Sequence, residues 1–276
     1  MKSLPEVYDA LLEDARDGVA AAAYGPSADE AGPLYEGLVD SFQGLAICNL
    51  LQPYDAEQFR TDLVFAAGAR RQFLQLCQRD AAAPAARALS RTEALFCAVA
   101  ARDDALAGDL VRLGPAEWVA DAEYEDDFCY HALVSHAATP EAARPLPPPD
   151  VLLGRAAAVL DGGTTPRLEA AAALAGGDAG RFRLAFDDLL VERAAWADEM
   201  VPHQGDQPLF VAARHVFVEG LALLALADVR GWPMPDAYVF CPELARLAPT
   251  DALPRDLFAD VVPFLRESRR ERGLPA

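Results

Sequence analysis

Lysine is almost absent from this sequence, and arginine does not make up for the missing positive charge. Lys2 is the one lysine, and Lys and Arg together number 24 against 43 Asp and Glu, which gives a net charge of −19 at pH 7. A protein that binds nucleic acid needs a basic surface for the phosphates, so the composition argues against a nucleic-acid partner. It favours partners of the opposite charge instead.

Cysteine and histidine are too few and too scattered to indicate a site. The chain has five cysteines and four histidines, and it contains neither a CxxC nor an HExxH motif. His131 and His136 are five residues apart, which separates them by about 140° around a helix. We therefore expect no disulfide framework, no metal site and no cofactor, and buried thiols in a reducing compartment. The cysteines are Cys48, Cys77, Cys97, Cys129 and Cys241.

A membrane or export segment is also missing from the sequence. The N-terminal region carries acids at Glu6, Asp9 and Glu13, where a secretory signal has an uncharged apolar run. The longest informative uncharged stretch, residues 41–54, is shorter than a bilayer span and includes Gln43. The sequence thus predicts a cytoplasmic protein with no membrane partner.

The sequence does contain a large apolar fraction arranged with helical periodicity. Hydrophobic residues make up 53% of the 276, so the chain can bury a core. Apolar residues recur every three to four positions, and no convincing β-alternation is present. The predicted fold is all-α, an irregular stack of antiparallel helix pairs (α/α, helical-repeat-like). The expected helices span residues 4–24, 33–51, 55–77, 87–102, 103–113, 116–138, 151–160, 166–175, 181–200, 208–230 and 255–272.

Proline is concentrated in residues 139–150, which read TPEAARPLPPPD. Proline interrupts helices and favours extended polyproline geometry. This stretch is the predicted connection between an N-terminal helical half, residues 1–138, and a C-terminal half, residues 151–276. It is equally compatible with a long surface connection inside one domain. In the C-terminal half, residues 208–230 are apolar nearly all round, which predicts a buried central helix.

Two ionisable residues interrupt that apolar helix. His215 and Glu219 are spaced i,i+4, with Arg214 beside them. One interpretation is a polar lock that fixes helix packing, because buried ionisable groups must be paired or hydrogen-bonded. The other is a general-base pair in a helical enzyme. No nucleophile or second acid accompanies the pair, so we expect no catalytic residues and a protein that is not an enzyme.

The densest negative charge lies between residues 121 and 127, on the predicted helix 116–138. Acids interleaved with aromatic residues suit either a solvated helix face or a docking surface for a cationic protein. A polar loop near residues 198–206 is a second candidate surface. The candidate partner-binding residues are Asp121, Glu123, Tyr124, Glu125, Asp126, Asp127 and Tyr130 in the first patch, and Asp198, His203 and Asp206 in the second.

One motif extends from the predicted central helix into the region that follows it. It comprises VEGLALLALA at 218–227, then Arg230-Gly231, Tyr238 and Pro242-Glu243-Leu244, together with FQGLA at 42–46. This pattern resembles the immunity protein 49 family of bacterial polymorphic-toxin systems. The resemblance implies a helical, cytosolic protein that is encoded beside a toxin and neutralises it by binding. It implies no catalytic residues.

The predicted function is therefore that of an immunity protein, which occludes the active site of a cognate toxin with a basic surface. Two alternatives stay open. One is a helical-repeat scaffold or adaptor for another cytosolic protein, and the other is a helical enzyme that uses His215 and Glu219. A toxin gene immediately upstream would favour immunity, whereas an open polar pocket at His215 would favour the enzyme.

Overall fold

The computed structural model describes residues 2–249 and Phe258, and it confirms the all-α fold. This part of the chain contains no β-strand, and helix packs against helix. Two 3-10 turns, Ala85–Arg87 (η1) and Leu89–Arg91 (η2), follow the third helix. The α-helices are Leu4–Ala22 (α1), Ala28–Leu51 (α2), Ala56–Arg79 (α3), Ala94–Ala100 (α4), Asp104–Leu113 (α5), Glu125–Ala138 (α6), Pro149–Val159 (α7), Pro166–Gly176 (α8), Ala179–Gln204 (α9), Pro208–Ala213 (α10), Val218–Val229 (α11) and Glu243–Arg246 (α12).

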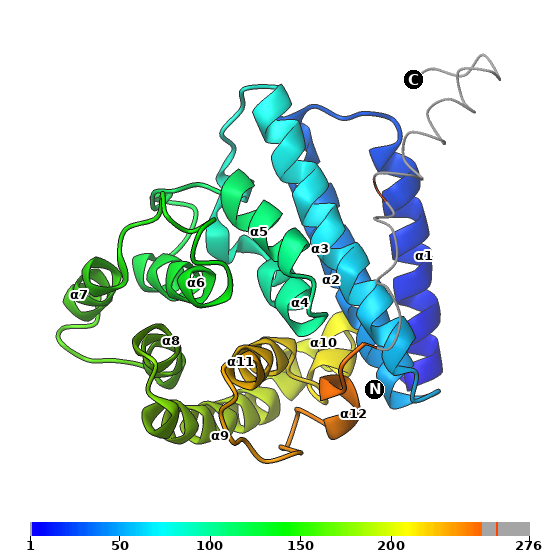
Figure 1. Cartoon of the computed structure of the whole chain (residues 1–276). Coiled ribbons are helices and arrows are strands. Elements are labelled where there is room, and N and C mark those ends of the chain that lie inside the picture. Colours follow the sequence, from blue (N-terminus) through cyan, green and yellow to red (C-terminus); the bar gives the residue numbers. More distant parts are fainter. Residues whose placement is uncertain (1, 250–257, 259–276) are drawn as a thin grey trace.

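Three long helices form one side of the molecule. Helices α1, α2 and α3 run side by side, and α4 and α5 lie against α3 (Figure 1). Helices α6 to α9 make up the other side, and α11 packs against α4 between the two sides (Figure 1). The short α10 packs against α1 and α2, so segments far apart in the sequence meet in the middle of the fold.

Aspartate caps begin three of the helices, and aspartate is a residue that commonly occupies this position before a helix. The Oδ1 atom of Asp55 accepts a hydrogen bond from the backbone N–H three residues later at 2.8 Å. Asp103 and Asp178 make the same contact at 2.9 Å. Each cap satisfies a backbone donor that has no partner within its helix, so local chemistry fixes these three starts.

Two helices are shorter than the sequence predicts. The predicted helix 87–102 is helical only over Ala94–Ala100, because the 3-10 turns occupy its first residues. The predicted helix 116–138 begins only at Glu125. Before it, Asp121 has a φ of 66°, a left-handed conformation that an α-helix excludes. The Trp118 indole also donates to the backbone oxygen of Glu123 at 3.0 Å. The five acids of the first patch therefore do not share one helix.

The predicted central helix 208–230 is interrupted and forms α10 and α11. The backbone of Phe217, between them, is extended, and its N–H donates to the carbonyl of Phe240 at 2.8 Å. This bond ties residue 217 to the loop after α11 instead of to α10. Helix α11 keeps the predicted burial, since nine of its 12 residues are buried.

Two helices extend past prolines at which the sequence predicts a boundary. The predicted helix 33–51 begins earlier, at Ala28, so Pro33 lies inside α2 and not in its first turn. The predicted helix 181–200 continues through Pro202 to Gln204 in α9. Each proline removes one intrahelical hydrogen bond, and in helices of 24 and 26 residues the other turns outweigh that loss.

The two predicted halves pack closely against each other. The proline-rich residues after α6 form turns that bury Ala143 and Leu146, and α7 begins at Pro149. Arg102, in the first half, pairs with the carboxylate of Asp228 at 2.8 Å, and Arg246 pairs with the same carboxylate at 3.0 Å. Together with the packing of α11 on α4, these contacts make the junction of the halves part of the core.

Two further predictions concern membranes and the end of the chain. No helix among the described residues combines the length and the apolar character that crossing a bilayer requires. The predicted terminal helix 255–272 lies outside the described residues, apart from Phe258. The ring of Phe258 is buried, and its centroid lies 6.2 Å from that of Tyr35 and 6.3 Å from that of Phe42.

Candidate protein-binding groove

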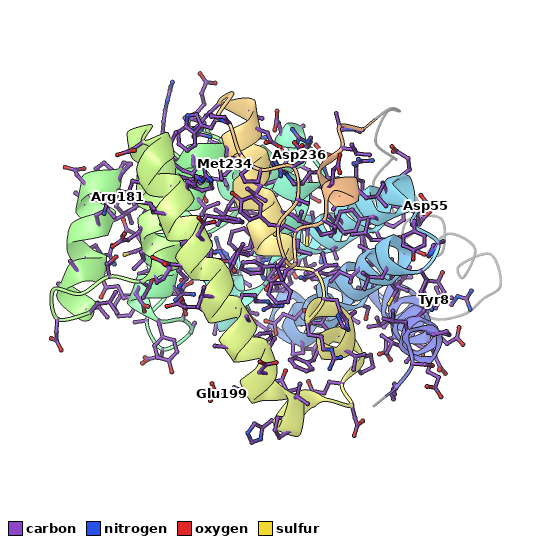
Figure 2. The ribbon with its side chains drawn as sticks, turned by 90° about the horizontal axis from the view of Figure 1, so that it is seen from below. Tyr8, Asp55, Arg181, Glu199, Met234 and Asp236 are labelled. Atoms are coloured by element: carbon purple, nitrogen blue, oxygen red, sulfur yellow. The ribbon has the colours of Figure 1, made fainter. Side chains whose placement is uncertain are left out.

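A hollow lies where the helices are interrupted. It has a volume of about 290 Å³ and is enclosed by α2, residues 90–93, the far end of α9, and α10 with its connection to α11. This end of α9 carries Glu199, and Arg181 marks the opposite end of the same helix (Figure 2). Asp40 and Glu93 line the hollow together with the aromatic rings of Trp196, Phe210 and Phe217. We call it the inner hollow.

An outer hollow of about 570 Å³ adjoins the inner one. Asp121, Tyr124 and Asp127 line it, and Ser90 and Arg91 line both hollows. The two hollows are therefore neighbours on either side of these residues, and we call them together the acidic groove. It runs from the start of α6 to the end of α9.

The groove carries negative charge that its neighbouring cations compensate only in part, since Arg193 is the one arginine of the inner hollow on which Glu93 acts. Asp40 and Asp121 are exposed, and neither forms an ion pair within the described residues. Glu93 accepts a hydrogen bond from a glutamine amide at 2.5 Å, and no cation pairs with it in that part of the chain. Arg91 does not compensate these acids, because it is paired with Glu36 at 2.8 Å.

The surroundings of Asp40 change its ionisation. Burial against the groove wall, followed by repulsion from Glu93 and Glu36, raises the pKa of Asp40 to about 6. The carboxylate of Asp40 remains exposed, so solvent weakens both effects. A cation bound in the groove would favour the charged form again.

Arg193 lies inside the inner hollow, where two aromatic rings hold it. Its guanidinium is 4.1 Å from the ring centroid of Trp196 and 4.9 Å from that of Phe217. Its Nη2 donates to a backbone carbonyl of α10 at 2.6 Å, and its Nε is buried without a partner. Two cation–π contacts and a backbone hydrogen bond hold the guanidinium in place. The carboxylates of Glu93 and Glu219 attract this guanidinium electrostatically.

Glu219, at the start of α11, belongs to a buried polar cluster next to the inner hollow. The Tyr130 hydroxyl donates to Glu219 Oε1 at 2.6 Å, and the Arg167 guanidinium lies 5.3 Å from the Tyr130 ring centroid. Burial, followed by repulsion from Glu93, raises the pKa of Glu219 to about 7. Burial also raises the pKa of Tyr130, which therefore stays a hydrogen-bond donor.

Metal ligands and reactive thiols do not add to this site. The described residues contain no group of three or more His, Cys, Asp or Glu that could hold a metal ion. The five cysteines are buried and free. Burial raises the pKa of Cys48 to about 11 and that of Cys241 to about 12, so both thiols stay protonated and unreactive at neutral pH.

No protein-family model, no curated protein and no solved structure matches this chain. The assignment of the groove therefore rests on its own residues. The resemblance to the immunity protein 49 family stays a prediction, carried by a motif that forms α11, the loop after it and the start of α12.

Most acids of the first predicted patch are engaged within the protein. Their partners lie on the neighbouring helices and on the segment before α4, so these acids hold the start of α6 in place. Reversing their charges would break these contacts and would test folding as much as binding. Glu123 bonds to Ser90 at 2.9 Å, Glu125 pairs with Arg155 at 2.7 Å, and Asp126 and Asp127 both pair with Arg167.

The other residues of the first patch divide between surface and core. Tyr124 is 78% exposed, and Asp121 is exposed beside it on the outer hollow. Tyr130 is only 1% exposed, because α6 turns it inward to Glu219. The predicted place of Tyr130 on a binding surface is therefore wrong.

The second predicted patch lies at the far end of the groove. Asp198 and His203 are exposed on α9, and Asp206 is exposed just after it. Gln204 and Gln207, next to them in the chain, line the inner hollow. The two patches, predicted separately, thus lie near opposite ends of one groove.

His215 and Glu219 do not lie on one face of a common helix, as their spacing predicts. His215 lies in the interruption between α10 and α11, where it is exposed and accepts a hydrogen bond from the Arg214 guanidinium at 3.1 Å. Glu219 lies on α11 and is bonded to Tyr130. The i,i+4 argument is wrong here because it requires one continuous helix.

Four residues of the inner hollow escape the sequence analysis: Asp40, Glu93, Arg193 and Trp196. They come from α2, the segment before α4 and α9, so no local pattern joins them. The one available signal is the spacing of Arg193 and Trp196. A cation and an aromatic residue three apart share a helix face and can stack.

Proposed function

We propose that this protein is a cytoplasmic immunity protein that neutralises a cognate toxin by binding a basic segment of it in the acidic groove. The observation that carries the proposal is the charge of Asp40 and Asp121, which form no ion pair with the described residues, along a groove with aromatic walls. The motif that resembles the immunity protein 49 family supports the same function.

The chemistry of the groove suits arginine and lysine side chains presented by another protein. Carboxylates accept strong, charge-assisted hydrogen bonds from guanidinium groups. The exposed ring of Tyr124 offers the kind of aromatic anchor that dominates many protein interfaces. A toxin that attacks nucleic acid needs a basic active-site cleft, which has the complementary charge. Occluding that cleft requires no catalytic residue in the immunity protein.

The decisive experiment is co-expression with the protein encoded by the adjacent toxin gene, followed by titration calorimetry of the purified pair. We expect wild-type protein to rescue growth and to form a stable complex. The double variant Asp40→Lys/Asp121→Lys should weaken the complex by about 10-fold to 100-fold, because two attractions become repulsions. Both positions are exposed and form no ion pair with the described residues, so the helical content should not change.

The matched control is Asp9→Lys/Glu13→Lys on the exposed face of α1. It changes the net charge by the same amount without touching the groove, so it should keep nearly full affinity. Equal losses in both double variants would show that only bulk charge matters and would overturn the groove as the binding site. A complex that forms without rescuing growth would favour the scaffold or adaptor role.

A helical enzyme is the second candidate, favoured by one observation. A carboxyl group with a pKa near neutrality beside a hollow is typical of acid–base catalysis, and Glu219 has one of about 7. The variant Glu219→Gln distinguishes the two functions. It removes a group that can act as an acid or a base, and it leaves the exposed residues of the acidic groove unchanged. Full rescue by this variant supports binding, and lost rescue with unchanged affinity supports catalysis.

A further inference from the structure

The segment 87–92 also borders a second, much smaller cavity. Helices α3, α5 and α6 enclose it together with this segment, and its volume is about 30 Å³. That is room for one water molecule or one monatomic ion, since roughly 10–15 Å³ suffices for a water. Thr92 lines both this cavity and the inner hollow of the acidic groove.

All the ionisable side chains on the cavity wall are basic. Arg70, Arg87 and His131 line it, and no described carboxylate does. The remaining wall is apolar apart from two hydroxyls. The hydroxyl of Ser135 donates to the backbone oxygen of His131 at 2.8 Å, whereas that of Thr92 makes no hydrogen bond to the described residues.

Arg70 is buried without a counter-ion. It is 5% exposed and donates to two backbone carbonyls at 2.6 and 2.7 Å. The carboxylates of Glu36 and Glu123 attract Arg70 electrostatically without forming an ion pair with it. Glu36 is paired with Arg91, and Glu123 is bonded to Ser90. Burial lowers the pKa of Arg70 to about 10, because removing the charged guanidinium from water is unfavourable.

Two nitrogen atoms of the wall residues are buried without a hydrogen-bond partner. They are Nδ1 of His131, which is 7% exposed, and Nε of Arg87. Neither arginine forms an ion pair within the described residues, and their charges oppose each other across the cavity. An unpaired buried Nε–H on Arg87 and unneutralised buried charge on both arginines are costly, so the wall lacks an acceptor that carries negative charge. The neutral His131 ring can also donate to such an acceptor in the tautomer that carries its proton on Nδ1.

We propose that this cavity binds a single monatomic anion, a chloride ion, between Arg70, Arg87 and His131. A halide supplies the missing negative charge and accepts hydrogen bonds from several directions, which suits donors that converge on a small volume. Sulfate and phosphate are too large for this cavity. The site is independent of the proposed function, because none of its charged residues lines the acidic groove.

Thermal unfolding in matched salts tests the site. Wild-type protein should have a higher Tm in sodium chloride or bromide than in sodium gluconate at the same ionic strength, because the ion binds only the folded state. The Tm should rise with halide concentration and then saturate. Equal Tm values in all three salts would overturn the proposal.

Two variants and a crystal structure with bromide test whether the ion binds in this cavity. Arg87→Gln should abolish the dependence on halide while keeping the fold, since Arg87 makes no ion pair with the described residues. The control Arg181→Gln removes an exposed arginine of α9 that does not line the cavity, so its halide response should match that of the wild type. In crystals grown with sodium bromide, anomalous scattering should mark one bromide beside Arg70. Density without anomalous signal would identify a water and refute the site.

Discussion

Glu219 holds a proton that the unfolded chain would release. Its pKa is about 7 in the folded protein, against an ordinary value of 4.5. Between these two pH values the folded state binds more protons than the unfolded state, so the free energy of unfolding falls as the pH rises through this window.

The variant Glu219→Gln should remove this part of the pH dependence. The amide oxygen still accepts from Tyr130, but the side chain no longer loses a proton. The free energy of unfolding of the variant, taken relative to that of wild type, should rise by on the order of 1–2 kcal/mol from pH 5 to pH 8. Urea unfolding at both pH values measures the difference, and a constant difference between the proteins would contradict the prediction.

His131 produces the opposite dependence. Burial, followed by repulsion from Arg167 and Arg70, lowers its pKa to about 3 from an ordinary 6.5. Between these values the unfolded chain binds the extra proton, so stability falls as the pH drops below about 6.5. His131→Asn should therefore flatten the loss of stability between pH 7 and pH 5. The exposed His203→Asn should leave that slope unchanged, and similar slopes in both variants would refute the role of His131.

At the scale of the element, two glycines on helices have opposite roles. A Cβ atom at Gly220 in α11 would lie 2.5 Å from a ring carbon of Phe217 and 2.9 Å from Sγ of Cys241. A Cβ atom at Gly154, within the exposed part of α7, would meet nothing within 4 Å. Gly220 allows the close contact that starts α11, whereas Gly154 only weakens its helix.

The matched substitutions should shift stability in opposite directions. Gly220→Ala should cost about 1–3 kcal/mol by overpacking, and Gly154→Ala should add about 0.5–1 kcal/mol by favouring the helix. Chemical denaturation of both variants gives the two values. A stable Gly220→Ala protein would show that Phe217 moves freely and would weaken the account of the interruption before α11.

The sequence predicts most helices well but misses their interruptions. Periodicity and caps such as Asp55 and Asp103 depend on local chemistry, so they can be recognised without the fold. The interruption at residue 217 depends on a bond to Phe240, and the late start of α6 depends on the loop contact of Trp118. Such tertiary contacts override local propensity and have no periodic signature.

The same reasoning explains why the candidate site was found only in part. The acids near residue 121 are dense in the sequence, but their arginine and serine partners lie on other elements, which a linear reading does not place. Asp40 and Glu93 are isolated acids in apolar segments. The groove forms where helices stop, so the mistaken helix boundaries coincide with its walls, as often occurs at functional sites.

At the scale of the whole molecule, the two predicted halves should unfold together. Helix α11 of the second half packs on α4 of the first, and Asp228 receives arginines from both. We expect single-tryptophan proteins that keep either Trp118 or Trp232 to report the same urea midpoint. These rings belong to different halves, so separate midpoints would instead support two independent domains.

The net charge of −19 should govern how fast a basic toxin associates. Electrostatic steering raises association rates by roughly 10–10³-fold and is screened by salt. We therefore expect the association rate of the toxin complex to fall about tenfold or more between 20 and 200 mM salt, with much less change in dissociation. Stopped-flow measurements give both rates, and a salt-independent association rate would exclude steering.

The segment 87–92 separates two regions of opposite charge, because carboxylates line the groove on one side and arginines line the small cavity on the other. Thr92 contributes to both walls, so an ion that shifted this residue would also change a wall of the groove. By thermodynamic reciprocity, an ion that changes the affinity for a partner has its own affinity changed by the same factor. Salt should therefore affect the affinity of a partner for the groove in two ways. It screens the charges on the surface, and a halide bound in the small cavity acts on the segment that the cavity shares with the groove.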